Sequence, residues 1–491
     1  NINEEDLRNL YNKRPNRRLM GLPIATLVSV YYMGEKRYHQ EKYIRKKEAF
    51  EKKFDQKIAR TTSQKKINKF QFKRQKKVDK MNSYIENGNL LMQWGEPLSL
   101  FDSSQVTLTT ERFSSYLFSK GYFKNSVSSR LNVQDKRVRV NYQINPGRPY
   151  ILDSIVYDIG DTAILNIIEK NMNETLLIRR ANYDQESFTK ERERIDFLLK
   201  DNGYYDFSRQ YIDFEVDTTF RRPERKVAVI VTIREPERRG YHKKFFIDKI
   251  TFTTDVGETK PGVERQTEIY RDIQYQYFTR HYNPKTLGQR VFIKPGELYS
   301  RSKTINTQRQ LGNVDAFKFI NINYDTSGGK FIANIFASPL SRNEWTNEVG
   351  LNVTQGFPGP FYIMSFKRRN IFRGMETFDL SGRFGFEGVA AATSTQLIYK
   401  STEAGINASM TFPQFIFPLS ERRRIKVAQF NPKTKFSAGY VYTDRPEYRR
   451  TAVIANGTYT WQNNRKTLFS FTPVNIGMRD TSNLCTDFKK L

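Results

Sequence analysis

The chain is poor in the residues that build reactive or metal-binding centres. Among its 491 residues Cys485 is the only cysteine, so no disulfide can form within the chain and no thiolate cluster can hold a metal. The three histidines, His39, His242 and His281, do not stand at metal-ligand spacing, and no second type of ligand gathers near them. We therefore predict no metal site, no cofactor and no catalytic residue, and we expect a protein that is not an enzyme.

Two further absences narrow the classes of protein. No glycine-rich phosphate loop occurs, because the segment 356–359 lacks the lysine and the helix that a nucleotide site needs. No run of about 18 apolar residues occurs either; the apolar segment 19–33 is interrupted by Gly21 and Pro23. The chain also begins without a signal sequence. We expect either a soluble protein, or a processed or truncated one that meets a membrane without a spanning helix.

Positive charge is abundant and unevenly spread. The chain has 82 Lys and Arg against 52 Asp and Glu, a formal net charge of +30. Residues 31–80 alone carry 18 basic and 6 acidic residues, a net +12. Such an excess suggests nucleic acid or an anionic membrane surface as a partner, and it marks one region of the chain.

The basic region predicts two amphipathic helices, over residues 41–58 and 65–84, each with an apolar stripe among lysines. One interpretation is a solvated face above a packed stripe. Another is a surface that adsorbs to anionic lipid headgroups. Nucleic acid is disfavoured, because the region lacks the glycine-aromatic or arginine-glycine texture that stacks on bases. The residues predicted to face a membrane are Lys46, Lys53, Lys73, Arg74, Lys76 and Lys77.

One supersecondary unit occurs three times: a helix, a break, and two alternating strands joined by a short turn. The break reads glycine, then two aromatic residues, at 121–123 and at 203–205; a looser third copy runs from 302 to 335. Glycine can supply the left-handed cap of the helix, and the aromatic pair can then enter the core. The pattern predicts three units of strand, helix, helix, strand, strand in line, the third with a long irregular excursion to about Arg290. Such repetition indicates a modular binding array.

Beyond Pro339 the texture changes to alternating strands of about ten residues, rich in glycine and tyrosine, which is typical of a transmembrane β-barrel. Residues 345–491 leave room for about seven strands at roughly 20 residues for each strand and loop. An open sheet would leave unpaired backbone groups in hydrocarbon, so we expect the barrel to be incomplete in this chain. The charge run 421–424 is interpreted as a solvated face. The predicted strands cover 345–354, 361–365, 378–385, 403–412, 435–442, 452–460 and 468–476.

Taken in order, several short motifs resemble those of the Omp85 superfamily. The tandem units look like POTRA domains, and a hairpin rich in asparagine, aromatic residues and glycine is similar to one early in the superfamily's barrels. The opening motifs most resemble the TamA-like branch of Bacteroidetes called TamL. The residues that carry the resemblance are the turns 145–147 and 294–296, the hairpin 370–374, and the segments 13–16, 19–23 and 94–97.

The resemblance implies tandem α+β POTRA domains followed by an antiparallel transmembrane β-barrel. Two departures stand out: the first unit starts at a helix, which suggests residues before Asn1 and with them a lipidated cysteine, and the superfamily's Arg-Gly-Phe motif has no convincing match after residue 345. The expected domains are 1–149 with a basic helical insertion at about 34–93, then 150–240, 241–340, and 341–491 for the N-terminal part of the barrel.

The implied function is assembly or translocation of proteins at the bacterial outer membrane, with the POTRA domains in the periplasm. An exposed sheet edge can take up an extended client through backbone hydrogen bonds. An ordinary covered edge remains an equal alternative. The implied partners are outer membrane lipid, unfolded outer membrane protein clients and a TamB-like periplasm-spanning protein. The residues expected on such edges are Val127, Leu131, Val133, Tyr211, Phe214 and Val216.

The barrel, by the same resemblance, opens between its first and last strands to release client strands. The polar residues of the first strand are as readily explained as an ordinary lumen-facing set. Three units favour a TamA-like role over the BamA-type insertase, which usually has five; a soluble basic scaffold that binds nucleic acid is the alternative from another class, motivated only by charge. The residues predicted along the seam strand are Trp345, Val349, Leu351 and Val353.

Overall fold

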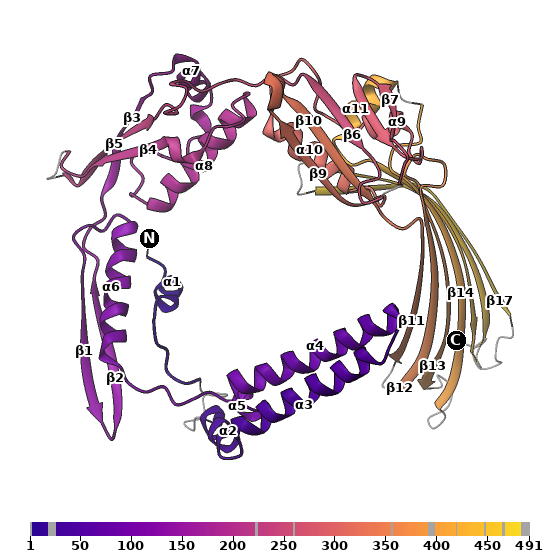
Figure 1. Ribbon diagram of the computed structural model, residues 1–491, viewed down its shortest axis with the longest axis horizontal. Coiled ribbons are helices and arrows are strands. Elements are labelled where there is room, and N and C mark those ends of the chain that lie inside the picture. Colours follow the sequence, from indigo (N-terminus) through magenta and orange to yellow (C-terminus); the bar gives the residue numbers. More distant parts are fainter. Residues whose placement is uncertain are drawn as a thin grey trace, which may run out of the picture. The chain divides into compact units, whose positions relative to one another are not determined.

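The computed structural model describes residues 2–17, 26–220, 224–258, 261–354, 357–390, 398–418, 420–445, 448–463 and 467–482. The chain divides into two compact units. Figure 1 draws its helices and strands, coloured along the sequence. No helix among the described residues is both long and apolar enough to cross a membrane. The first unit comprises 1–156, 176–190 and 214–230, and the second 157–175, 191–213 and 231–491.

The first unit begins with helices that start at polar caps. Asn3 and Asp102 accept hydrogen bonds from the amides of Glu5 and Ser104, which satisfies donors that a helix start leaves free. Both predicted basic helices are confirmed, as α3 and α4. The helices are α1 (Glu4–Asn9), α2 (Thr26–Glu35), α3 (Gln40–Ala59), α4 (Gln64–Asn87), α5 (Leu90–Trp94) and α6 (Ser103–Ser119).

Helix α6 covers a two-stranded antiparallel sheet of β1 (Ser126–Gln134) and β2 (Arg137–Asn145). The two-residue turn uses positive φ angles of 48° and 58° at Asp135 and Lys136, as the twist of such a hairpin requires. The ring of Phe113 on α6 is buried and lies 5.2 Å from that of Tyr142 on β2.

The middle repeat has the predicted order of strand, helix, helix, strand, strand, and its sheet order is β3-β5-β4. Val227, Val229 and Val231 of the central strand are fully buried, whereas β3 and β4 are the edge strands. Its elements are β3 (Ile151–Asp158), α7 (Thr162–Lys170), the 3-10 turn Met172–Glu174, α8 (Gln185–Asp201), the 3-10 turn Arg209–Tyr211, β4 (Ile212–Asp217) and β5 (Lys226–Ile233).

The third repeat contains more regular structure than expected. Its sheet order is β7-β8-β6-β10-β9, in which β8 and β10 both run parallel to β6. The prediction of an irregular excursion to about Arg290 is wrong, because β7, β8 and α9 lie within it; these elements have five residues each, too short for a clear periodic signal. The elements are β6 (Lys249–Thr253), β7 (Gln266–Tyr270), β8 (Ile273–Tyr277), α9 (Pro284–Gly288), α10 (Arg301–Gly312), β9 (Phe317–Asp325), the 3-10 turn Ser327–Gly329 and β10 (Ile332–Pro339).

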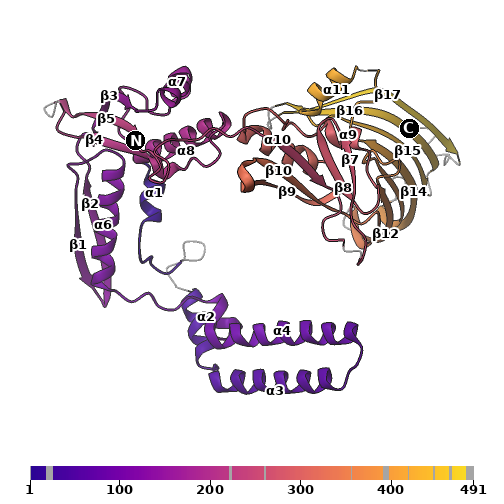
Figure 2. The same ribbon diagram turned by 45° about the horizontal axis from the view of Figure 1, so that its top comes forward.

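The rest of the second unit is a curved seven-stranded antiparallel sheet whose strands follow in chain order from β11 to β17 (Figure 2). All seven predicted strands are confirmed, and β11 and β17 form the two edges of the sheet as described. The charge run 421–424, interpreted above as a solvated face, lies in a helix, α11. The elements are β11 (Asn343–Thr354), β12 (Phe357–Arg369), β13 (Thr377–Ala390), β14 (Ile398–Phe412), α11 (Glu421–Ala428), β15 (Lys433–Asp444), β16 (Arg449–Asn463) and β17 (Thr467–Ser482).

Candidate functional site

The seven-stranded sheet has one apolar and one polar face. Because successive residues of a strand point to opposite faces, two adjacent rows of cross-strand neighbours sample both. The row on the apolar face consists of Trp345, Phe366, Leu380, Ala408, Ala438, Ala455 and Ile476. The row beside it consists of Glu344, Lys367, Asp379, Ser409, Ser437, Asn456 and Asn475.

The apolar face is exposed to its surroundings. Val349 is 79% exposed and Ile406 is 53% exposed, although both are large aliphatic side chains. A shallow groove of about 430 Å³ crosses the same face where glycine takes the place of a larger side chain at Gly382. An apolar face that covers a whole sheet is far larger than the scattered apolar residues of ordinary protein surfaces, and it marks contact with protein or lipid.

Strand β11 brings the four predicted seam residues to the edge of this sheet. Within the described part of the chain β11 pairs with β12 alone, and Trp345 and Val353 are 59% and 64% exposed. Val349 and Leu351 lie between them on the same apolar face, as the predicted alternation requires. Opening of the sheet at this edge stays a prediction, and the position of β11 at the edge is compatible with it.

The turn after β12 packs into the third repeat and joins the sheet to it. Met375 is buried in the hydrophobic core of that repeat, and its amide donates to Asn370 Oδ1 at 3.1 Å. Glu376 Oε2 accepts from the amides of Phe372 and Gly374 at 3.2 and 3.0 Å. Asn370 and Met375 hold positive φ angles of 57° and 66°, a strained conformation that these contacts maintain.

An ion cluster fixes the same end of β12. Arg369 donates from Nε to Asp315 at 3.0 Å and from Nη2 to Glu344 at 2.6 Å, and Lys367 Nζ lies 3.1 Å from Asp315. Partial burial alone would raise the pKa of Asp315, but the hydrogen bonds and charges of Arg369 and Lys367 outweigh it and hold this pKa below its ordinary value. The cluster therefore joins β9's leading loop to β11 and β12.

A second link is made by a fully buried arginine. Arg290 Nη1 donates to the carbonyl of Gln310 at 3.1 Å, and its Nη2 donates to the carbonyl of Pro413. Burial lowers the pKa of Arg290 to about 10, because desolvation disfavours the charged form. Sequence reasoning missed Arg290, since nothing around it distinguishes it from the other 81 basic residues.

The aromatic breaks join neighbouring repeats. Tyr204 is buried within the middle repeat, whereas the next residue, Tyr205, packs its ring 5.0 Å from those of Tyr299 and Phe331 in the third. The first break behaves alike: Phe123 packs 4.9 Å from Tyr150. Both aromatic residues of the motif therefore pack against apolar residues, as expected. The first ring packs within its own repeat, and the second packs against the next repeat.

The predicted strand-addition residues fall on two kinds of position. Leu131 and Val133 on β1 are 49% and 67% exposed, and Val127 lies on the same strand, which pairs only with β2 among the described residues. Phe214 and Val216 lie on β4, the edge of the middle sheet, although the ring of Phe214 packs on that of Phe188. Tyr211 was misplaced on the edge: it belongs to a 3-10 turn, and its ring contacts His242.

The third sheet fills one of its own edges. In the middle repeat the first strand, β3, is an edge; the corresponding β6 is covered by β8, and β7 becomes the edge instead. Ile269 on β7 is 74% exposed. This added hairpin does in cis what a bound peptide strand would do at β6, so β6 is closed to strand addition.

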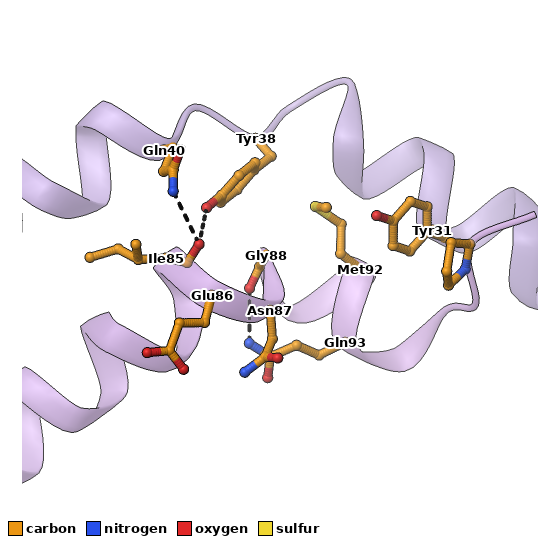
Figure 3. A pocket seen from close by; sticks show the side chains of 10 residues that line it. Tyr31, Tyr38, Gln40, Ile85, Glu86, Asn87, Gly88, Met92 and Gln93 are labelled. Atoms are coloured by element: carbon orange, nitrogen blue, oxygen red, sulfur yellow. Dashed lines mark hydrogen bonds between the residues drawn. The ribbon is translucent and has the colours of Figure 1, made fainter.

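The predicted basic residues belong to one antiparallel helical hairpin, α3–α4. At its base, shown in Figure 3, Tyr38 donates its hydroxyl to the carbonyls of Tyr84 and Ile85 at 2.9 and 3.1 Å beside a cavity of about 580 Å³. Arg74 forms an ion pair with Asp55 at 3.2 Å across the hairpin, so it serves the hairpin's own packing. The residues predicted for a membrane surface that remain exposed are Lys46, Lys53, Lys73, Lys76 and Lys77.

No group of three or more potential metal ligands occurs among the residues that the structure describes. His242 is packed against Phe207, and its ring nitrogen Nε2 lies 3.1 Å from the carbonyl oxygen of Arg234. Burial lowers the pKa of His242, which favours the neutral ring.

Comparison with known proteins gives one family match. The family described as "POTRA: Surface antigen variable number repeat" matches residues 31–147. No curated protein matches the chain.

Solved structures show partial likeness. Half of the chain aligns with 84% of BamA POTRA3-5 from Haemophilus influenzae (13% identity, TM-score 0.28). The chain spans 64% of Haemophilus ducreyi BamA lacking POTRA domains 1-3 (10%, 0.34) and 62% of CdiB from Acinetobacter baumannii (10%, 0.24), with 68% of its own length covered in both. It thus spans less than two thirds of the last two structures. What the chain contains is an N-terminal POTRA domain and, toward its C-terminus, a large antiparallel sheet of seven strands.

Proposed function

We propose that this protein is an outer membrane protein assembly or translocation factor of the Omp85 type, with its tandem α/β repeats in the periplasm. The observation that carries the proposal is the two-faced sheet: an apolar row and the polar row beside it each run across all seven strands, which follow a POTRA domain. A strand that faces lipid on one side and a polar lumen on the other has this alternation. The exposed apolar face argues against a soluble scaffold that binds nucleic acid.

In this proposal the repeats bind clients by strand addition. The edges β1 and β4 offer backbone groups whose hydrogen bonding does not depend on client sequence, which suits a protein that handles many clients. Aromatic contacts at Phe123 and at Tyr205 join residues on the two sides of each junction between repeats. The burial of Met375 in the core of the last repeat then couples that repeat to the sheet.

Strand β11 is the proposed exit. A client strand that pairs with its free edge would continue the sheet and bring its own apolar side chains to the lipid face. The ion cluster around Arg369 holds the start of β11 through Glu344. Near the other end of the strand Asn352 donates to Glu387 of β13 at 3.0 Å, a hydrogen bond from a neutral amide that is weaker than the paired charges of the cluster. We expect opening to begin near Val353.

The finer assignment we propose is TamA-like, with a TamB-like partner, because three sheet-bearing repeats precede the large sheet. Depletion in the native bacterium distinguishes it from the BamA-type role. A TamA-like factor predicts loss of a few outer membrane proteins with continued growth, as measured by quantitative proteomics. Collapse of most outer membrane proteins with arrest of growth would instead assign the insertase role.

Photo-crosslinking tests the proposed exit. The protein is reconstituted in liposomes with a photo-reactive phenylalanine at Val349 on edge strand β11, or at Val453 on β16 as the matched control; both lie on the apolar face. A urea-unfolded β-barrel client is then added. We expect client adducts at Val349 and lipid adducts alone at Val453. Equal client adducts at both positions, or client folding no faster than in empty liposomes, would refute the proposal.

A further inference from the structure

The hairpin α3–α4 has a thin interior. Figure 2 shows the two helices side by side. Among the residues of α3 and α4 whose burial the structure describes, only Phe54, Val78 and Met81 are buried. Lys77 covers the ring of Phe50, with its Nζ 4.5 Å from the ring centroid. Most of the hairpin's surface is therefore available to a partner, and little of it is needed for packing.

The hairpin tip, residues 52–77, is the half of the hairpin around its turn. It carries 11 Lys and Arg against Asp55 alone, a net charge of +10. Asp55 pairs with Arg74, and within the part of the chain that the structure describes no carboxylate pairs with Lys69, Lys73 or Lys76. A helical hairpin that needed this charge for its own stability would pair it, because lysines at this density repel each other.

One large apolar side chain stands among these lysines. Phe72 is 71% exposed, on the opposite side of α4 from the buried Val78 and Met81. Lys69 and Lys76 lie three residues before and four residues after it, so they flank Phe72 on one helical face. An exposed phenylalanine surrounded by ammonium groups gains nothing from contact with water. It matches a lipid surface, which has anionic headgroups outside and hydrocarbon beneath.

We propose that the hairpin tip docks onto an anionic lipid bilayer surface, with Phe72 inserted below the headgroups and Lys69, Lys73 and Lys76 on their phosphates. The inference rests on the proposed function only for the presence of a nearby membrane. Nucleic acid fits less well, since the rings of Phe50, Phe54 and Tyr43 are occupied within the hairpin and a single exposed ring gives no platform for successive bases.

A fluorescent reporter tests the docking. In a Cys485→Ser background, Gln71→Cys carries an environment-sensitive dye beside an intact Phe72, and an amphipathic polymer covers the large sheet of the complete chain. Vesicles contain phosphatidylcholine with or without about 30 mol % phosphatidylglycerol. We expect a blue shift of the dye with the anionic vesicles and none with the neutral ones, reversed by salt.

Variants separate charge from insertion. Lys69→Glu, Lys73→Glu and Lys76→Glu together should weaken vesicle binding at least 100-fold, since each lysine near such a surface is worth roughly fivefold. Phe72→Ala should weaken it about tenfold. Matched charge reversals at exposed lysines elsewhere, Lys124→Glu, Lys136→Glu and Lys330→Glu, should change it little. If circular dichroism shows that the glutamate variant loses helix, the corresponding Lys→Gln variant replaces it.

Three results would each overturn the docking. They are vesicle binding unchanged by the tip variants, an equal dye shift with neutral vesicles, and tighter binding of a single-stranded oligonucleotide than of anionic vesicles. The β11 crosslinking experiment does not depend on the hairpin. Failure of docking with successful client crosslinking therefore leaves the proposed function intact, and the reverse result leaves the docking intact.

Discussion

The carbonyl of Gly203 accepts a hydrogen bond from the amide of Phe245 at 2.9 Å, across the junction between the middle and third repeats. Gly121 makes the same bond with Tyr150, also at 2.9 Å, one repeat earlier. Two features of the structure favour glycine at position 203. Gly203 has a φ angle of +101°, and a Cβ atom there would lie 2.8 Å from Leu298 Cδ2. The repeated motif thus encodes a joint between repeats as well as the end of a helix.

Gly203→Ala should therefore destabilise the protein by about 2 kcal/mol, from the unfavourable φ angle and the contact with Leu298. Chemical denaturation measures the change. Gly240→Ala is the control, because Gly240 also has positive φ but open space around its Cβ position. Adding Leu298→Ala should remove the close contact but not the cost of the unfavourable φ angle. Equal losses of stability in Gly203→Ala and Gly240→Ala would show that the contact with Leu298 contributes nothing.

The two faces of the sheet predict opposite tolerance to charge. Val349→Arg places a guanidinium on the apolar face and should reduce the stability of the lipid-inserted protein by about 2–4 kcal/mol. Thr346→Arg, on the polar face of the same strand, should have a small effect. Heat-modifiable gel migration after reconstitution measures the folded fraction. Equal sensitivity at the two positions would contradict the assignment of faces.

The ion cluster predicts a pH-dependent contribution from Asp315. A carboxyl group whose pKa is lower in the folded than in the unfolded chain stabilises the fold above its unfolded value, and loses this contribution as pH falls through the folded value. Asp315→Asn should thus lower the denaturation midpoint at pH 7, and the difference should shrink below the ordinary pKa of 3.8. Asp158→Asn, at an exposed residue, serves as the control. A difference that persists undiminished in acid would exclude the charge as its cause.

Arg290 predicts a contrast between two substitutions. Arg290→Ala should destabilise by about 3 kcal/mol, because it leaves a cavity and frees the carbonyls of Gln310 and Pro413. Arg290→Met keeps most of the volume and removes a buried charge, so the loss should be only about 1 kcal/mol. Urea denaturation compares the two variants. Equal losses would mean that the hydrogen bonds outweigh the packing.

The elements themselves follow from local patterns. Alternation of period two predicts each strand from β11 to β17, and helical periodicity predicts α3, α4 and α8, because burial of one face selects the same side chains along the element. The charge of the hairpin tip is also visible in the sequence. The short β7 and β8 and the helix α11 were missed, since an element of five to eight residues contains too few repeats of its period.

The sequence by itself determined the repeats, the seven strands, their two faces and the two basic helices, because each depends on spacing within one segment. Only the tertiary structure decided which ring of each aromatic pair crosses to the next repeat, that β8 covers β6, and that Met375 and Arg290 tie the sheet to the third repeat. These contacts join residues far apart in the chain. Their partners are selected by the packing of whole elements, which no local spacing encodes.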